Sequence, residues 1–476
     1  MATDIKLYID GRWADPIADG GTFSIVNPAT EEQVAAVNAA SVADVDVAVA
    51  AARRAFGSFS QTGRDERLEL LQNLLSAYTR RIPEFTDAMT TEIGIPRAFC
   101  EQVQAGIGER HIKAAIAALA EYPFEIEWGT TRLFKEPIGV CGLISPWNWP
   151  MNQIVVKVAP ALAAGCTMVL KPSQLNPLSA NLFAEAVHEA GIPAGVFNMV
   201  HGSGTSLGGA LAAHPDVDLV SFCGSTEVGA IVAAAAAPTI KRVAQELGGK
   251  SVNIMFEDVN VPKAVAAGVR GCMRNSGQTC NAPTRMLVTQ ELYEEAVAIA
   301  ARTADSLVVG DPLDPETFLG PVASKRQYET VRGYIEIGLA EGARLVAGGL
   351  DRPAGWERGY FIKPTVFADV SNGMRIAREE IFGPVLCIIP FKDEDEAIAI
   401  ANDSDFGLSA YVNSGDIERA RRVARRLRTG MVHLNGANTD LTAPFGGYKQ
   451  SGNGREWGRF GMEDYLEVKS VMGYDR

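Results

Sequence analysis

Residues 139–171 read GVCGLISPWNWPMNQIVVKVAPALAAGCTMVLK. A short apolar run at 140–145 is followed by a longer apolar segment at 153–164 and by a second short run at 167–170. Short apolar runs are typical of buried strands, and longer periodic ones are typical of helices. The stretch therefore predicts a strand, a helix and a second, parallel strand, which is the repeating unit of doubly wound sheets.

The same alternation continues downstream. Further strands are expected at 196–200, 219–223 and 241–247, and further helices at 179–189, 206–213 and 226–237. Five strands that alternate with four helices predict an α/β fold with a Rossmann-like parallel sheet, whose ligands bind beyond the carboxyl ends of the strands. The alternation resumes between Gly248 and Pro444, so we expect a second α/β domain there.

The flanking segments have other patterns. Short strands and turns are expected over 5–40, amphipathic helices over 42–118, a hairpin over 120–137 and a strand over 465–471. A terminal strand beside a projecting hairpin suits pairing between subunits, although a strand tucked into its own domain is equally compatible. The expected domains are a dinucleotide-binding domain (1–119 and 138–247), a catalytic domain (248–446) and an oligomerisation arm (120–137 and 455–476).

Bulk composition narrows the class of protein. At about 150 residues per domain, 476 residues correspond to roughly three domains, and 47% hydrophobic content is ordinary for a globular protein. The net charge of -13 argues against nucleic acid or an anionic membrane as a partner. Seven irregularly spaced cysteines favour a reducing compartment, and five histidines in no ligand spacing predict no metal site. Without a signal-peptide or membrane-span pattern, the expected location is cytoplasmic.

Cys280 closes the stretch Arg274–Cys280, which reads RNSGQTC. Glycine near a thiol lets the backbone turn sharply, so that the N–H of a nucleophile can face a bound carbonyl. The alternative is a small buried hydrophobic cysteine, which is the commoner role of this residue type. The rest of the chain must supply a base, an oxyanion donor and a cofactor site if Cys280 is a nucleophile.

Two residues at predicted strand ends fit the first two requirements. Asn148 lies in the rigid loop PWNWP at 146–150, where its amide N–H is placed to stabilise an oxyanion, while Trp149 is expected to pack against other aromatic rings. Glu246 ends a strand before two glycines, and partial burial there would raise its pKa and make it a general base. The alternative for Glu246 is a surface glutamate.

Three more stretches suit a dinucleotide. In FCGSTEVG at 222–229, Gly224 permits a tight turn and Ser225 can donate to a phosphate at a helix N-terminus, or can simply cap that helix. Lys171, in KPSQ, can reach a ribose hydroxyl or phosphate, or can be a solvated lysine at a turn. The pair Glu379–Glu380 can bind ribose hydroxyls, or can be a helix-end charge pair.

Together these motifs, with Pro-Phe-Gly-Gly-Tyr-Lys-x-Ser-Gly at 444–452, resemble the aldehyde dehydrogenase superfamily over residues 7–470. The resemblance implies an NAD(P)-dependent enzyme that oxidises an aldehyde through a cysteine thiohemiacetal and a thioester. It implies Cys280 as nucleophile, Glu246 as general base, and Asn148 with the Cys280 N–H as oxyanion hole. The implied cofactor-binding residues are Ser145, Trp147, Asn148, Lys171, Pro172, Ser173, Gln174, Gly204, Gly224, Ser225, Leu247, Gln327, Glu380 and Phe382.

Two departures from the family pattern bear on specificity. Many NAD-preferring members carry Glu where this chain has Gln174, so NADP should be tolerated and is a candidate for the preferred cofactor. Val156, before Lys157, stands where some succinate-semialdehyde members carry Arg, and Trp149, Met151 and Val156 are expected to face the substrate. An apolar aliphatic or aromatic aldehyde is therefore expected, with a homodimer or homotetramer as the assembly. The competing hypotheses are a coenzyme-A-acylating enzyme, against which Glu246 counts, and a non-catalytic nucleotide-binding or structural relative.

Overall fold

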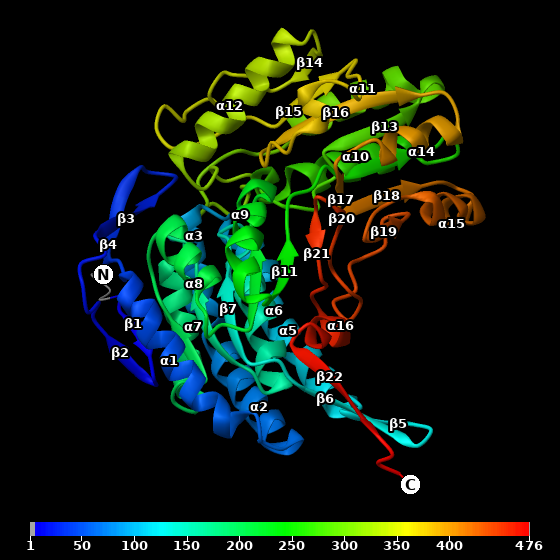
Figure 1. Ribbon diagram of the computed structural model, residues 1–476. Coiled ribbons are helices and arrows are strands. Elements are labelled where there is room, and N and C mark those ends of the chain that lie inside the picture. The colour runs from blue at the N-terminus through cyan, green and yellow to red at the C-terminus, as the bar shows by residue number, and fades with distance from the viewer. Residues whose placement is uncertain (1–4, 476) are drawn as a thin grey trace.

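The computed structural model describes residues 5–475 and contains two large sheets and a projecting arm (Figure 1). The first sheet has the strand order β2-β1-β9-β8-β7-β10-β11-β21. Its five parallel strands are β7 (Val140–Ile144), β8 (Thr167–Lys171), β9 (Phe197–Met199), β10 (Leu219–Cys223) and β11 (Arg242–Glu246). The antiparallel edge strands are β1 (Leu7–Ile9), β2 (Arg12–Ala14) and β21 (Gly452–Asn453). In chain order the parallel strands are arranged third, second, first, fourth, fifth, which confirms the doubly wound sheet.

Both faces of this sheet are covered, because its strands are apolar on both sides. In β7, Cys141 and Leu143 pack into one core, whereas Val140 and Ile144 pack into the other. This alternation follows from the two-residue period of a strand. The first core takes helices α2 (Arg64–Arg80), α3 (Ile82–Ile93), α5 (Ala105–Glu121), α6 (Pro150–Ala164) and α7 (Pro177–Glu189), and the second takes α1 (Val42–Phe59), α8 (Gly209–Ala213) and α9 (Thr226–Ala236).

The predicted helix at 206–213 has a different beginning from the one expected. Its first turn is the π-helical segment η2 (Gly204–Gly208), and α8 continues from it. Another π-helical turn, η1 (Cys100–Gln104), joins the short α4 (Arg97–Phe99) to α5. Single π turns are frequent at functional sites.

The second sheet has the order β14-β15-β16-β13-β12-β18-β19 and is parallel except for β14. Its strands are β12 (Val252–Met255), β13 (Arg285–Thr289), β14 (Arg344–Ala347), β15 (Thr365–Ala368), β16 (Val385–Phe391), β18 (Ser409–Asn413) and β19 (Met431–Leu434). Its helices are α10 (Val261–Met273), α11 (Tyr293–Asp305), α12 (Lys325–Ala340), α13 (Arg375–Arg378), α14 (Glu394–Asn402) and α15 (Ile417–Arg426). The expected second α/β domain is thus present as a sheet with helices on both faces.

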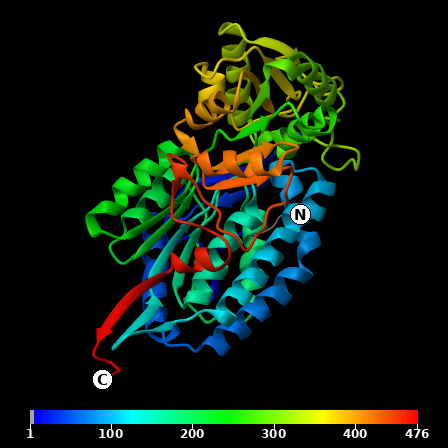
Figure 2. The same cartoon turned by 90° about the vertical axis from the view of Figure 1, so that its right-hand side faces the viewer.

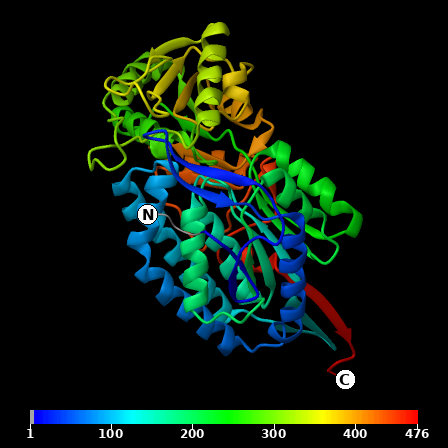
Figure 3. The same ribbon diagram turned by 90° about the vertical axis from the view of Figure 1, so that its left-hand side faces the viewer.

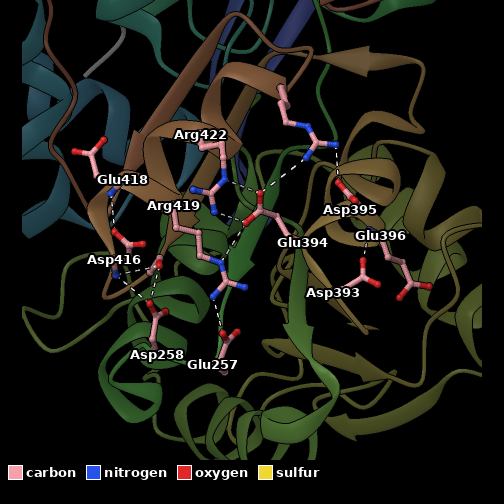
Figure 4. A network of polar contacts seen from close by, with 12 residues as sticks. Glu257, Asp258, Asp393, Glu394, Asp395, Glu396, Asp416, Glu418, Arg419 and Arg422 are labelled. Carbon is pink, nitrogen blue, oxygen red and sulfur yellow. Dashed lines mark hydrogen bonds and ion pairs between the residues drawn. The ribbon is translucent and has the colours of Figure 1, made fainter.

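A charged network joins α15 to its neighbours (Figure 4). Glu394 of α14 accepts from Arg422 at 2.9 Å and lies 3.4 Å from Arg419, and Arg419 also pairs with Glu257 at 2.6 Å. Isolated surface pairs contribute little, but a network that shares one carboxylate holds several side chains at once. The network ties α15, which connects β18 and β19 at the edge of the sheet, to the rest of this domain.

The predicted hairpin and terminal strand form one small sheet. Its order is β22-β6-β5, with β5 (Glu125–Trp128), β6 (Thr131–Pro137) and β22 (Leu466–Met472) all antiparallel. All three views show this arm extending from the body (Figures 1, 2 and 3). The preceding helix α16 (Gly458–Glu463) packs against α5 and α6 instead, because Met462 is buried in the first core.

Two small antiparallel pairs remain. The strands β3 (Thr22–Asn27) and β4 (Glu32–Asn38) form a hairpin, and β17 (Phe406–Gly407) pairs with the distant β20 (Tyr448–Lys449). Between residues 5 and 475, no helix is long and apolar enough to cross a membrane.

Candidate active site

The loop before Cys280 has an unusual backbone. Asn275, Ser276 and Gly277 have φ values of +55°, +53° and +72°, three consecutive residues in the left-handed region. A Cβ on Gly277 would lie 2.1 Å from the carbonyl oxygen of Gly383, so only glycine fits there. The predicted role of this glycine in a sharp turn therefore has a concrete cause, which is close approach to the backbone of the 383–384 turn.

An amide network joins the Cys280 loop to the loop after β7. The Asn148 side chain donates to the Gln278 carbonyl at 3.1 Å, and the Asn275 side chain donates to the Asn148 carbonyl at 3.0 Å. Gln104 donates in turn to Asn275 Oδ1 at 3.1 Å. Asn148 thus lies next to the Cys280 loop with its orientation fixed, and its amide group carries a second N–H for another acceptor.

Asn275 was not among the predicted site residues, although it bonds to both loops. The signal that identifies it is conformational, since Asn is enriched at positive φ among non-glycine residues. That preference becomes informative only once the backbone is known.

Cys280 is partly exposed, whereas the other six cysteines are buried. It packs against an apolar cluster of Val156, Leu408, Phe445 and Trp457, hereafter the apolar wall. Burial raises the pKa of the Cys280 thiol well above its ordinary value, and the carboxylates of Glu380 and Glu246 raise it further. Because its pKa is raised, the thiol is protonated at neutral pH.

Glu246 stands at the end of β11 and is 4% exposed. Within residues 5–475, neither of its carboxylate oxygens has a hydrogen-bond partner. Burial raises its pKa well above the ordinary range, and nearby Glu456 adds to the shift. A Cβ on Gly446 would lie 2.7 Å from Glu246 Oε1, so glycine there makes room for the carboxylate. Glu246 is therefore buried, and the alternative of a surface glutamate is wrong.

A small cavity whose lining includes ionisable side chains borders Glu246. Its lining includes Glu246, Arg455, Glu456 and Asp464. Glu456 also accepts from the fully buried Lys157 ammonium at 2.6 Å. The carboxylate of Glu246 therefore faces other ionisable groups and not only apolar side chains.

Glu380 and Phe382 contact the loops that follow β11 and β7. Glu380 Oε1 accepts from the backbone N–H of Gly249 at 2.9 Å, and burial raises the pKa of Glu380 to about 7. The Phe382 ring meets the Trp147 ring edge-on, with centroids 5.5 Å apart. Gln327 donates to the Phe382 carbonyl at 2.8 Å, so it supports this loop from behind.

Polar groups that lack partners gather at the carboxyl ends of the first sheet. Ser145 Oγ and both ring nitrogens of His201 are buried without hydrogen-bond partners in the described part of the chain. Lys171 donates to the carbonyl of Pro172 at 2.8 Å, and burial lowers its pKa to about 8. Donors and acceptors of this kind fit the hydroxyls and phosphates of a dinucleotide. His201 was not predicted, because a histidine outside a recognisable spacing carries no signal in the sequence.

The remaining predicted cofactor residues line the same edge. Ser225 is exposed and accepts from the Val228 N–H at 3.4 Å, so it caps α9 while its helix N-terminus stays open to an anion. Ser173 Oγ accepts from the Leu175 N–H at 3.2 Å. Gln174 and Gly224 are partly exposed, Gly204 is exposed, and Leu247 is buried.

The three residues expected to face the substrate, Trp149, Met151 and Val156, have different surroundings. Val156 belongs to the apolar wall, and Trp149 donates to Thr279 Oγ1 at 3.1 Å while its ring packs edge-on against Phe99. Met151 is fully buried in the first core. Five residues along a helix turn the side chain by about 140°, so Met151 and Val156 of α6 face different ways. The prediction for Met151 is therefore wrong.

Comparison with known proteins agrees with this geometry. The model of the aldehyde dehydrogenase family matches residues 13–471. The chain belongs to the aldehyde dehydrogenase family. It is 56% identical to a 3-succinoylsemialdehyde-pyridine dehydrogenase of Pseudomonas sp over 99% of this chain and 98% of that protein.

Solved structures of relatives carry the cofactor. A mutant of aldehyde dehydrogenase C from Pseudomonas syringae, in complex with NAD+ and octanal, is 52% identical with a TM-score of 0.98, covering 99% of this chain and 97% of that one. The NAD+ complex of an aldehyde dehydrogenase from Bacillus cereus is 39% identical with a TM-score of 0.95, covering 98% and 96%. This enzyme is thus an oxidoreductase that uses NAD to oxidise aldehydes to carboxylic acids.

Proposed function

We propose that Cys280 is the nucleophile, that Asn148 and the Cys280 N–H form the oxyanion hole, and that Glu246 is the general base. The observation that carries these roles is the amide network that holds Asn148 against the Cys280 loop, 3.1 Å from the Gln278 carbonyl. The Cys280 thiol gives its proton to the Glu246 carboxylate, which releases it to solvent, and the thiolate adds to the aldehyde carbon. The two N–H groups stabilise the resulting oxyanion. When bound, the nicotinamide accepts a hydride from that carbon.

Glu246 acts again in the second half of the reaction, the hydrolysis of the thioester. Loss of the hydride leaves a thioester on Cys280, and water must attack its carbonyl carbon. Glu246 removes a proton from that water, and the Cys280 thiolate leaves as the carboxylic acid forms. Burial and nearby Glu456 raise the pKa of Glu246, so this carboxylate takes up a proton more readily than an ordinary glutamate, as a general base must.

The cofactor-binding roles follow the same edge of the sheet. Lys171 holds the adenosine ribose, Ser225 binds the pyrophosphate beside Trp147, Glu380 binds the nicotinamide ribose, and Phe382 packs by the nicotinamide. The remaining contacts come from Ser145, Pro172, Ser173, Gly204, Gly224, Leu247 and Gln327.

NADP is proposed as a second cofactor. Gln174 is neutral, and it therefore does not repel a 2′-phosphate as a carboxylate at this position would. This residue is partly exposed at the strand end next to Lys171.

The proposed substrate is an apolar aliphatic or aromatic aldehyde. The side chains against which Cys280 packs are apolar, and a relative holds octanal. The Pseudomonas relative is named for an aldehyde that carries a pyridine ring. An apolar wall favours such substrates because their burial removes apolar surface from water.

The proposed assembly is a homodimer or homotetramer in the cytoplasm. Trp128, Val468 and Met472 on the arm are 70%, 60% and 77% exposed. Apolar side chains on a projecting sheet with a free edge favour pairing with a second chain. Seven free thiols suit a reducing compartment.

A panel of aldehydes tests the proposal. Hexanal, octanal and benzaldehyde are incubated with NAD+ or NADP+, with and without coenzyme A, and reduced cofactor is followed by its absorbance. Oxidation without coenzyme A is expected, with a free acid as product. Strict dependence on coenzyme A would instead indicate an acylating enzyme, and cofactor binding without any oxidation would indicate a non-catalytic relative.

A further inference from the structure

Trp457 carries a buried hydrogen-bond donor in the apolar wall beside Cys280. The side chain is 8% exposed, and its indole Nε1 has no hydrogen-bond partner among residues 5–475. A buried indole N–H normally finds an acceptor, because an unpaired buried donor destabilises the folded state. The other members of the wall, Val156, Leu408 and Phe445, offer only carbon atoms from their side chains.

The backbone conformation at Trp457 is strained. Trp457 has a φ of +74°, which is unfavourable for a bulky side chain. The preceding residue, Glu456, exchanges two backbone hydrogen bonds with Phe445 at 2.9 and 2.8 Å, and the rings of Phe445 and Trp457 lie 4.5 Å apart. Strained conformations that the surroundings enforce tend to occur at functional sites.

The nearest polar ring does not pair with the indole. The His111 ring lies 5.5 Å from the Trp457 ring, and its Nε2 is hydrogen-bonded with Asn152 Oδ1 at 2.7 Å. Burial lowers the pKa of His111 to about 4, so it is neutral. Among residues 5–475 the indole N–H therefore has no acceptor, neither in this ring nor elsewhere.

Helix α6 brings a second polar group toward the same region. Asn152 and Gln153 lie four and three residues before Val156, and therefore one turn along the face that carries Val156. Gln153 Oε1 is also buried, again without a partner in the described residues. Polar groups thus occur about one helical turn, ~5.4 Å, beyond the apolar side chain that packs beside the thiol.

We infer that Trp457 donates a hydrogen bond to the body of the substrate, and that the preferred substrates are aldehydes with a carbonyl or similar acceptor a few carbons from the reacting group. This inference rests on the proposed function, since it assumes that an aldehyde lies between Cys280 and the apolar wall. The inference adds that the substrate should carry a hydrogen-bond acceptor, which an entirely apolar wall would not require.

The test compares two aldehydes that differ in one carbonyl, 4-oxo-4-phenylbutanal and 4-phenylbutanal. The wild-type enzyme is expected to show a kcat/KM about tenfold higher for the oxo compound, the size of one hydrogen bond in a dry site. Trp457→Phe keeps an aromatic ring and removes the donor, so this ratio should fall to near 1, mainly through KM. Trp356→Phe, a matched change where the ring packs on Phe361, should keep the wild-type ratio.

Equal kcat/KM values for the two aldehydes in the wild type, or an unchanged ratio in Trp457→Phe, would overturn the inference and leave the proposed function intact. Oxidation of neither aldehyde, nor of hexanal, would overturn the proposed function itself. If Trp457→Phe does not fold, the inference is tested by inhibition of the wild-type enzyme with two carboxylic acids. In that test 4-oxo-4-phenylbutanoate should bind about tenfold more tightly than 4-phenylbutanoate. Equal inhibition by the two acids would refute the role of Trp457.

Discussion

Replacing Gly277 by alanine tests whether backbone packing positions the nucleophile. The added Cβ would lie 2.1 Å from the Gly383 oxygen and 2.6 Å from the Pro384 nitrogen, whereas ordinary contact begins at 3.4 Å. Since both neighbours are backbone atoms, the two loops must separate by about 1.3 Å, the difference between 3.4 and 2.1 Å. The left-handed φ of +72° costs an alanine about 1–2 kcal/mol in addition.

Displacement of this size is expected to reduce catalysis strongly. Misplacement of reacting groups by 1 Å can lower a rate by about 10²-fold, so kcat/KM of Gly277→Ala should fall by ~10²-fold, or about 2.7 kcal/mol in transition-state stabilisation. The assay is steady-state oxidation of hexanal with NAD+, accompanied by thermal unfolding and NAD+ binding to show that the protein is folded.

Gly342→Ala separates the loss of activity caused by contact with Gly383 from the loss of stability caused by a left-handed φ. Gly342 has a φ of +83°, and a Cβ there would have no atom of residues 5–475 within 4 Å. This control should lose stability but retain kcat/KM within about twofold, since its strain is remote from Cys280. Equal activity of the two variants would refute the claim that contact with Gly383 positions the nucleophile.

Three further predictions concern the thiol and the cofactor site. Cys280→Ala should abolish oxidation while the Kd for NAD+ changes by less than about threefold, and loss of NAD+ binding would show a structural role for the thiol. Gln174→Glu should raise the NAD+ over NADP+ ratio of kcat/KM by about tenfold or more, because a carboxylate repels the 2′-phosphate; an unchanged ratio would refute the role of this position. Burial lowers the pKa of Lys171 to about 8, so its ammonium is present below pH 8 and is lost as the pH rises. Affinity for NAD+, titrated by fluorescence from pH 6.5 to 9.5, should therefore fall above about pH 8 in the wild type and stay flat in Lys171→Met.

Much of the site could be predicted because its residues occupy recognisable local positions. Asn148, Lys171, Ser225 and Glu246 all lie at or just after the ends of predicted strands of one parallel sheet, whose carboxyl ends meet at one edge. The strand and helix periods of the sequence are therefore enough to place these residues at that edge. Met151 shows where such prediction fails. It lies only three residues after Asn148, but helix α6 directs its side chain into the first core.

Other residues of the site have no local pattern. Asn275 depends on three partners, Gln104, Asn148 and Gln278, two of which are more than 100 residues away. Gln327 is similar, since its side-chain amide meets the Phe382 carbonyl 55 residues later. Contacts of this kind arise when segments far apart in the sequence pack together, and a single sequence does not encode their distances in any short spacing.

Strand and helix periods and motif spacings are local properties of the chain, so the doubly wound sheet, the second α/β domain and the candidacy of Cys280 and Glu246 could be read from the sequence. The burial of Glu246 beside Glu456 is visible only in the folded structure, as is the Trp457 donor, which has no partner among residues 5–475, in the wall beside Cys280. Burial and hydrogen bonding are properties of what surrounds a group in space, and those surroundings come from segments that lie far apart in the sequence.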